Sequence, residues 1–248
     1  MKGGAVLTRP RRSWPILFAI AVVLGQWWAA QAGPPEYAAE RADMVEKLRR
    51  SGITNRYVLA AMRRVPRHLF VSRVDRPRAY DDISIPVGGG QSIRQPSIVA
   101  ITMEKLELEP GHKILQVGTE CAYCTAVLCD IPLHVYVVDL REEMVRLAKS
   151  RLDALSYSAQ WRTGMACRGW PDHGPYDAIL VMCAANGVPD ALVRQLKVGG
   201  RMVIPIGEGP EQTLECVTKS PDGKLRSEVI KTSTPLRAQS MACQKPLP

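Results

Sequence analysis

Near the middle of the chain the sequence reads Lys113-Ile114-Leu115-Gln116-Val117-Gly118, a short apolar run that ends on a glycine. A second run, His134-Val135-Tyr136-Val137-Val138-Asp139, has a similar length and ends on an acid. Apolar runs of this length, bounded by turn residues, are typical of buried strands. Residues 122–129 between the runs and 144–155 after them have the apolar spacing of helices. Strands that alternate with helices predict βαβ units and a mostly parallel sheet.

Elements of both kinds continue toward the C-terminus. Residues 177–181 and 201–205 are predicted strands, and residues 189–197 are predicted to form a helix between them. Two further strand-like runs, at 213–218 and 228–232, lie close enough in sequence to pair with each other. We expect them to form an antiparallel edge of the sheet.

The part of the chain before Gly111 has a different pattern. Residues 40–65 predict two helices, and Thr54 is placed to cap the second. Residues 64–90 contain several prolines and the run Gly88-Gly89-Gly90, so we expect irregular structure there. Pro96 suits the first turn of a helix.

Composition and charge exclude several classes of protein. Of 248 residues, 46% are apolar and 23% charged, which is ordinary for a globular chain and excludes disorder or a collagen-like fold. The formal charge of +9 is unevenly distributed, because residues 1–32 hold four basic residues and no acid. The rest of the chain carries 29 basic and 24 acidic residues, a balance of +5. No dense basic stripe with interleaved aromatics is present, so we expect no nucleic-acid partner.

The first residues have the pattern of a targeting segment. Residues 1–13 are basic, residues 14–30 are mostly apolar, and Ala30-Gln31-Ala32 is a small-x-small cleavage pattern. These features predict a signal peptide over residues 1–32 and export to a periplasm or the exterior, with no stable membrane insertion after cleavage. The alternatives are an uncleaved N-terminal anchor, or a cytoplasmic protein if the segment is not a functional signal.

The parallel sheet predicts where a ligand binds. Ligands of such sheets lie at the carboxyl ends of the strands, where the strand order reverses. Gly118 ends the first strand, and Asp139 closes the second one 21 positions later. A carboxylate at this spacing commonly meets the ribose hydroxyls of a nucleoside-containing cofactor. The alternative is that Asp139 only caps the following helix.

Cysteines and histidines suggest weaker alternatives. Cys121 and Cys124 form a C-x-x-C motif at a strand-to-helix junction, where a redox thiol is conceivable. A zinc site could be drawn from Cys121, Cys124, Cys129 and His134, but the sequence has no second closely spaced pair of ligands to support it. We expect the cysteines to be small packing residues. The histidines lack ligand spacing and are expected to be exposed or to cap backbone groups; they are His68, His112, His134 and His173.

Four separated motifs follow one another along the chain. They are Arg67-His68-Leu69-Phe70-Val71, Ala79-Tyr80-Asp81-Asp82, Gln91-Ser92-Ile93-Arg94-Gln95-Pro96, and a segment from Gln195 to Gly207 that contains Gly199-Gly200-Arg201. In this order and spacing, from Met44 to Leu236, the chain resembles the protein-L-isoaspartate O-methyltransferases. The resemblance implies an α/β fold, namely the Rossmann-like fold of S-adenosylmethionine-dependent methyltransferases, with a mostly parallel sheet and an antiparallel C-terminal edge.

The resemblance also implies an activity and a domain plan. Proteins of this family transfer a methyl group from S-adenosylmethionine to the carboxylate of isoaspartyl residues, which begins the repair of damaged proteins. The expected partners are therefore damaged proteins or peptides that contain isoaspartate. After the signal, residues 33–110 would form a helical cap with the substrate loop, residues 111–240 the cofactor-binding core, and residues 241–248 a tail.

The motifs assign roles to residues. The substrate and catalytic positions of the family fall on Ser92, Arg94 and Gln95. The cofactor positions fall at the ends of three successive predicted strands, and no metal is implied. They are Gln116, Gly118, Glu120, Asp139, Leu140, Gly164 and Met165.

Several of these positions depart from the family pattern. The family's Gly-x-Gly-x-Gly loop is Gly118-Thr119-Glu120-Cys121-Ala122, and the acid two residues before it is Gln116. Gly-Asp-Gly appears as Gly164-Met165-Ala166, and Arg94 replaces a small hydroxyl residue. Besides an active enzyme, a second hypothesis is therefore an exported, non-catalytic homologue with a decayed cofactor site. Its Arg94 would bind peptide carboxylates. Alternatively, Glu120 compensates for the charge missing at Gln116.

The departures give a testable expectation. With lost polar contacts worth about 1–3 kcal/mol each, the natural chain should bind S-adenosylmethionine no better than about 1 mM, or roughly −4 kcal/mol. A variant carrying Gln116→Glu, Glu120→Gly, Ala122→Gly and Met165→Asp should bind at least about tenfold more tightly, by calorimetric titration. Micromolar binding by the natural chain would instead favour compensation by Glu120.

Overall fold

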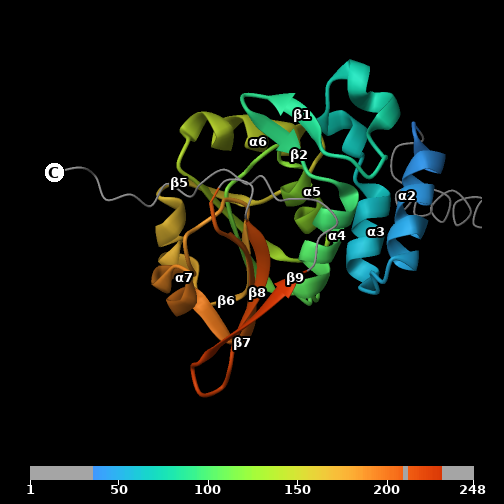
Figure 1. Ribbon diagram of the computed structural model, residues 1–248. Coiled ribbons are helices and arrows are strands. Elements are labelled where there is room, and N and C mark those ends of the chain that lie inside the picture. The colour runs from blue at the N-terminus through green and yellow to red at the C-terminus, as the bar shows by residue number, and fades with distance from the viewer. Residues whose placement is uncertain (1–35, 209–211, 231–248) are drawn as a thin grey trace, which may run out of the picture.

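The computed structural model describes residues 36–208 and 212–230, which form one central sheet with helices on its faces (Figure 1). Its seven strands lie in the order β5-β4-β3-β6-β7-β8-β9. The first five of these are parallel to one another, and β8 and β9 continue the sheet as antiparallel strands. The predicted mostly parallel sheet with an antiparallel C-terminal edge is therefore confirmed.

Each predicted strand of the central sheet is present, although the strands at residues 196–206 and 225–230 begin five and three residues earlier than predicted, and one further strand was omitted. The omitted strand is β5, Gln160–Thr163, which has mainly polar side chains and lies at the sheet edge. Its only large apolar residue is Trp161, so its sequence lacks the pattern of a buried strand. The other strands are β3 (Lys113–Val117), β4 (His134–Asp139), β6 (Tyr176–Val181), β7 (Leu196–Ile206), β8 (Thr213–Lys219) and β9 (Leu225–Ile230).

Most helices pack against one face of the sheet. These are α2 (Ala38–Arg50), α3 (Arg56–Arg64), α4 (Pro96–Lys105), α5 (Tyr123–Asp130) and α6 (Glu142–Ala154). Their buried side chains join Ile114, Val137 and Leu180 of the sheet in one continuous core. A smaller core on the opposite face contains Leu115, Val117 and Ile179, covered by the short helix α7 (Asp190–Gln195). The alternation of side chains along β3 thus supplies both cores.

A hairpin forms within and just beyond the segment that was expected to be irregular. Strand β1 (Ile85–Gly88) pairs antiparallel with β2 (Gln91–Ile93). Gly88, Gly89 and Gly90 make the turn with φ of 93°, 58° and 71°, a region that favours glycine. Two 3₁₀ helices, Arg67–Phe70 and Arg73–Arg78, precede it. The expectation of irregular structure was wrong for the hairpin, because its strands are too short to show a period.

The first motif of the family resemblance holds this hairpin in place. Arg67 is completely buried, and its Nε and Nη2 donate to the carbonyl oxygens of Ala79 and Ile83 at 2.7 and 3.4 Å. His68 is also buried, with Nδ1 2.8 Å from the hydroxyl of Tyr80, so the expectation of an exposed or capping histidine was wrong here. Burial lowers the pKa of His68. Both side chains fix the segment that leads into β1.

Helix α3 is capped by Asn55 rather than by Thr54. The Asn55 Oδ1 accepts hydrogen bonds from the backbone N–H groups of Tyr57 and Val58, at 3.0 and 3.2 Å. Thr54 instead donates its hydroxyl to Glu104 at 2.6 Å. The two residues are adjacent and both are good caps, so sequence alone did not distinguish them.

Within residues 36–208 and 212–230, no helix has the length and apolar content required to cross a membrane. The predicted signal peptide at residues 1–32, the cleavage pattern and the tail at 241–248 lie outside the described residues. The division of the domain into a cap and a core near residue 110 also stays a prediction.

The helix cap gives a test of this part of the fold. Asn55→Ala removes two capping hydrogen bonds and the Nδ2 bond to the Leu108 carbonyl. We expect a loss of about 1–2 kcal/mol in the free energy of unfolding, measured in urea. Thr54→Ala is the matched control and should cost less than half as much, since its contacts to Glu104 are exposed. A larger loss for Thr54→Ala would reverse the assignment.

Candidate functional site

The strand order reverses at β3. The chain runs from β3 outward to β4 and β5 on one side, and then crosses to β6 on the other side. Such a switch point leaves a crevice outside the carboxyl ends of the strands, where ligands of α/β sheets bind. The segments that follow β3, β4, β5 and β6 all meet at this edge, and the predicted site residues lie on the first three.

The turn after β3 keeps a glycine-type backbone although it has lost two glycines. Gly118, Glu120 and Ala122 have φ of 92°, 42° and 70°, all in the left-handed region. A Cβ at Gly118 would lie 3.2 Å from the Cβ of Met182, so a larger residue would force the turn and the segment after β6 apart. The left-handed region is unfavourable for Glu120 and Ala122, because both residues have a Cβ atom. The path of the loop is therefore maintained by its surroundings.

Asp139 ties this turn to the end of β4. Its Oδ2 accepts hydrogen bonds from the backbone N–H and the hydroxyl of Thr119, both at 2.8 Å. Its Oδ1 accepts from the backbone N–H of Arg141 at 2.9 Å, where α6 begins. The carboxylate is buried, with 5% of the residue exposed. Asp139 thus does more than cap a helix: it joins two loops of the crevice, and its remaining lone pairs can still accept from a ligand hydroxyl.

The neighbouring cofactor positions lie beside Asp139. The backbone N–H of Gly164 donates to the Asp139 carbonyl at 2.9 Å, which brings the segment after β5 to the end of β4. Met165 begins the short turn that follows. Leu140 is 46% exposed, an unusual position for a large apolar side chain next to a buried acid. The Asp139 carboxylate and the exposed Leu140 side chain thus place a polar group and an apolar surface on adjacent residues.

Gln116 lies below the turn and is completely buried. Its Nε2 donates to the Gly118 carbonyl at 2.8 Å, whereas its Oε1 accepts no hydrogen bond within the described residues. A buried acceptor without a donor costs about 1–3 kcal/mol, and it commonly indicates a missing water or ligand.

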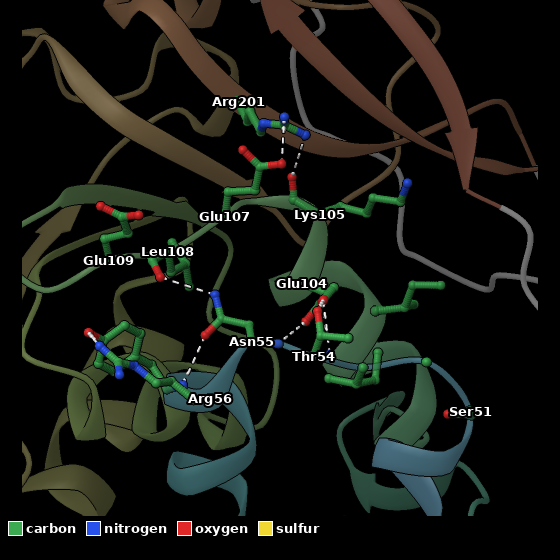
Figure 2. Close-up of a pocket in the computed structure, with 14 residues that line it drawn as sticks. Ser51, Thr54, Asn55, Arg56, Glu104, Lys105, Glu107, Leu108, Glu109 and Arg201 are labelled. Carbon is green, nitrogen blue, oxygen red and sulfur yellow. Dashed lines mark hydrogen bonds and ion pairs between the residues drawn. The ribbon is translucent and has the colours of Figure 1, made fainter.

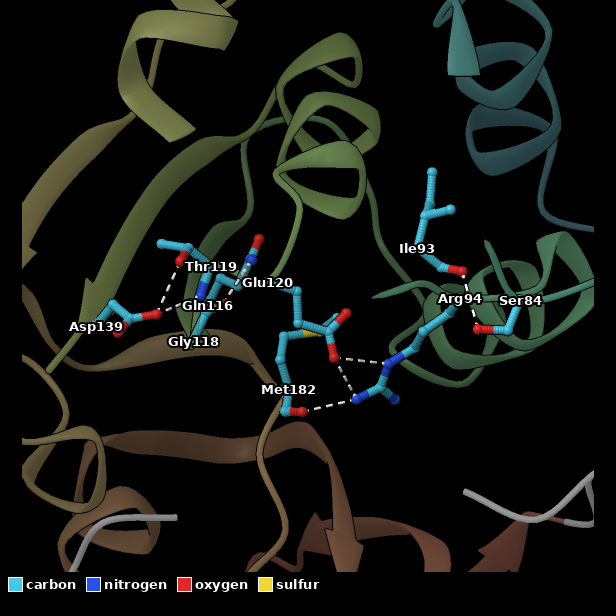
Figure 3. A network of polar contacts seen from close by, with 9 residues as sticks. All are labelled: Ser84, Ile93, Arg94, Gln116, Gly118, Thr119, Glu120, Asp139 and Met182. Carbon is cyan, nitrogen blue, oxygen red and sulfur yellow. Dashed lines mark hydrogen bonds and ion pairs between the residues drawn. The ribbon is translucent and has the colours of Figure 1, made fainter. Parts of the chain in front are cut away.

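An ion pair crosses the crevice from the substrate motif at residues 91–96 to the turn after β3 (Figure 3). Arg94, just after β2, donates from Nε and Nη2 to Oε1 of Glu120 at 2.9 and 2.7 Å. Nη2 also donates to the Met182 carbonyl at 2.6 Å, just after β6. Burial alone would lower the pKa of Arg94, but the charge and hydrogen bonds of Glu120 outweigh it and the pKa is raised. One guanidinium therefore joins three segments.

Two further residues extend the network. With its amide oriented to match its neighbours, Gln91 donates from its side-chain nitrogen to the Glu120 carbonyl at 2.6 Å. Its side-chain oxygen then accepts from Nη2 of Arg141, also at 2.6 Å. The hairpin is therefore fastened to the turn after β3 through both the backbone and the side chain of Glu120.

The other substrate-motif residues point elsewhere. The Gln95 Nε2 donates to the Asp82 carbonyl at 3.1 Å, which orders the start of α4 rather than the crevice. Ser92 lies on β2, and its hydroxyl makes no hydrogen bond within the described part of the chain. Motif spacing brought Arg94 to the correct edge of the sheet. It could not identify the roles of Met182, Gln91 and Arg141, since backbone carbonyls and tertiary partners leave no sequence signal.

The ion pair changes two of the sequence-based hypotheses. The Arg94 guanidinium already has a carboxylate partner, so only its Nη1 nitrogen is left to bind the peptide carboxylate of the non-catalytic hypothesis. Likewise, Glu120 Oε1 is engaged by Arg94, and only Oε2, which accepts no hydrogen bond within the described residues, is left to face a cofactor cation. Restoring glycine at position 120 alone would leave Arg94 without its carboxylate.

The cysteines near this turn are packing residues. Cys121 and Cys124 are buried free thiols. Burial raises the pKa of Cys121 to about 11 and raises that of Cys124 as well, which opposes the thiolate needed for redox chemistry. Within the described residues, no group of three or more histidine, cysteine or acidic side chains is arranged to hold a metal.

A separate pocket of about 640 Å³ lies elsewhere (Figure 2). It is lined by the α2–α3 turn, the end of α4 and Arg201 in the first half of β7, near the amino ends of the strands. Its charged groups are largely paired, for example Arg201 with Glu107 at 2.7 Å, and Glu104 with Thr54 and Asn55. This pocket is therefore distinct from the crevice.

Comparison with known proteins identifies relatives over most of the chain. Residues 39–235 match the family model described as Protein-L-isoaspartate(D-aspartate) O-methyltransferase (PCMT). The Protein-L-isoaspartate O-methyltransferase of Xanthomonas campestris pv. campestris (strain B100) is 43% identical over 190 residues, covering 77% of this chain and 84% of the relative. Protein-L-isoaspartate O-methyltransferase 2 of Polaromonas sp. (strain JS666 / ATCC BAA-500) is 45% identical over 175 residues, covering 70% and 83%.

Solved structures agree on the fold. A protein-L-isoaspartate O-methyltransferase aligns with a TM-score of 0.70 and 24% identity, over 81% of this chain and 65% of its own. A putative protein-L-isoaspartate O-methyltransferase from Plasmodium falciparum, in complex with S-adenosyl-L-homocysteine, aligns with a TM-score of 0.68 and 20% identity, over 82% and 99%. The Rossmann-like methyltransferase fold is thus confirmed.

A double-mutant cycle tests the ion pair. Arg94→Gln and Glu120→Gln should each lower the free energy of unfolding by about 1–3 kcal/mol, because each leaves a largely buried charge unpaired. The double variant should lose less than the sum, with an interaction energy of about 1–2 kcal/mol in urea unfolding. The same cycle on the exposed pair Lys149–Asp153 is the control and should give below about 0.5 kcal/mol. Additive losses at positions 94 and 120 would contradict the pairing.

Proposed function

The chain belongs to the protein-L-isoaspartate O-methyltransferase family, and we propose that it transfers a methyl group from S-adenosylmethionine to the carboxylate of isoaspartyl residues in damaged proteins. The family membership rests on the match over residues 39–235 and on relatives above 40% identity. The activity and the roles of individual residues are the proposed part.

The observation that carries the proposal is the backbone of the turn after β3. Glu120 and Ala122 adopt left-handed conformations that side chains disfavour by about 1 kcal/mol or more each. Ordinary dihedral angles would remove this cost, yet the contacts of Arg94 and Asp139 hold the turn on the path that a cofactor loop needs. The retained path, with Gly118 packed against Met182, preserves the close backbone approach that the family's cofactor loop provides.

The polar atoms of the crevice fit the cofactor in kind. Within the described residues, Gln116 Oε1 and Glu120 Oε2 are buried acceptors without donors; they suit the ammonium as hydrogen-bond acceptors, and the Glu120 charge also suits the sulfonium. Asp139 would accept from the ribose hydroxyls, and exposed Leu140 offers an apolar surface to the adenine. The cofactor supplies an activated methyl group. The chain itself would orient the substrate carboxylate toward it, so positioning rather than a general base would carry the rate.

We propose export as well, on the strength of the basic, apolar and small-residue segments at residues 1–32. The non-catalytic alternative, a groove that binds peptide carboxylates, has less support, because the turn after β3 keeps the left-handed path of a cofactor loop. Cytoplasmic activity follows instead if the N-terminal segment is not a functional signal.

Methyl transfer to a matched pair of peptides tests the function. We expect transfer from labelled S-adenosylmethionine to a peptide with one isoaspartyl residue, and less than a tenth as much to the same peptide with aspartate. Asp139→Asn weakens a ribose acceptor and the Thr119 turn, and should raise the KM for the cofactor at least tenfold, about 1.4 kcal/mol. Asp153→Asn, an exposed acid on α6, is the control and should change the KM less than twofold. Equal labelling of the two peptides, or none, would refute the proposed activity.

A further inference from the structure

The Arg94–Glu120 ion pair lies between the two segments that would hold two different ligands. Arg94 belongs to the substrate motif between β2 and α4, and Glu120 to the turn after β3 where the cofactor would bind. The Met182 carbonyl fixes the guanidinium at the end of β6. The pair therefore occupies the switch point itself, with one charge on each side of the crevice.

Each member of the pair keeps one atom for a further partner. The contacts of Arg94 use Nε and Nη2, and Nη1 makes no hydrogen bond within the described residues. Figure 3 shows this third nitrogen turned away from the carboxylate. Glu120 accepts both bonds on Oε1, and its buried Oε2 has no hydrogen-bond partner within the described residues. A free donor and a free acceptor thus flank one shared ion pair.

The free atoms match the charges of the two ligands. The inference rests on the proposed function, which brings together a substrate carboxylate and a cationic cofactor. A carboxylate suits the guanidinium donor, and an ammonium or sulfonium suits the Glu120 oxygen. Placed in that order, the four groups alternate in sign, so every neighbouring contact is attractive.

We propose that the Arg94–Glu120 pair couples the binding of substrate and cofactor, so that each ligand raises the affinity for the other. When the cofactor binds alone, the Arg94 charge close behind Glu120 repels its cation. When the isoaspartyl carboxylate binds Arg94, it cancels this repulsion. In the same way, the negative charge of Glu120 repels the substrate carboxylate until the cofactor's cation neutralises Glu120. By linkage, both affinities rise by one common factor.

Calorimetric titration can measure this factor without turnover. The probe is a cofactor analogue in which a protonated amine replaces the sulfonium, so no methyl group can be transferred. In the natural chain, a saturating isoaspartyl peptide should tighten analogue binding at least tenfold, which corresponds to about 1.4 kcal/mol. The variant carrying Arg94→Ser and Glu120→Gly has the uncharged residues of the family pattern at both positions. The substrate carboxylate still attracts the analogue's cation directly in this variant, so its coupling should be weaker than that of the natural chain by at least about threefold rather than absent.

A second measurement uses the natural chain alone. Because the coupling is electrostatic, raising the salt from 0.05 to about 0.5 M should reduce it at least threefold, the crevice being only partly shielded from solvent. The variant carrying Lys149→Gln and Asp153→Asn loses an exposed ion pair on α6 and should keep the full coupling. This salt series decides the matter even if the Arg94→Ser/Glu120→Gly variant fails to fold.

The outcomes separate this inference from the proposed function. The natural chain could transfer methyl groups and yet bind the analogue with the same affinity with and without peptide. That result would overturn the coupling and would not contradict the proposed function. Undiminished coupling in the Arg94→Ser/Glu120→Gly variant, or coupling that salt does not change, would overturn it too. If neither analogue nor S-adenosylmethionine binds under any condition, the proposed function fails and the coupling fails with it.

Discussion

The hydrogen bonds from Arg94 to Glu120 and Met182 hold the crevice in its observed shape. They join the hairpin segment to the turn after β3 and the segment after β6; β3 and β6 pair with each other, whereas β1 and β2 form a separate two-stranded sheet. Gln91 adds a contact from the same hairpin to the Glu120 backbone. Asp139 also connects the turn after β3 to a neighbouring loop, but it makes no contact with the hairpin among the described hydrogen bonds.

The central sheet was predictable because its strands are buried on both faces. The run Ala178-Ile179-Leu180-Val181 in β6 is apolar and buried throughout, and this pattern is visible without tertiary information. Strand β5 and the β1–β2 hairpin were missed for the opposite reason. Their strands are short, β5 is largely polar, and what stabilises them is pairing with a neighbouring strand or anchoring by buried Arg67. Such stabilisation is a property of the folded molecule.

The position of the site was predictable for the same topological reason, but its internal contacts were not. Parallel strands bring the residues after β3, β4 and β5 to one edge, so Gly118, Asp139 and Gly164 meet whatever their identities. Spacing says nothing about side-chain partners 26 positions apart, such as Arg94 and Glu120. Comparison with the family motifs gave a wrong interpretation here, because it treated positions 94 and 120 as two independent losses of a small residue.

In physical terms, the departures at positions 94 and 120 are a single change. Arginine at position 94 with glycine at 120 would leave a largely buried guanidinium without a counter-charge, and glutamate at 120 with serine at 94 would leave a carboxylate in the same state. Either state costs at least as much as the left-handed strain of Glu120. Together the two residues satisfy one another and hold the turn on the path that a glycine would take. Charge therefore replaces backbone freedom as the means by which this crevice keeps its shape.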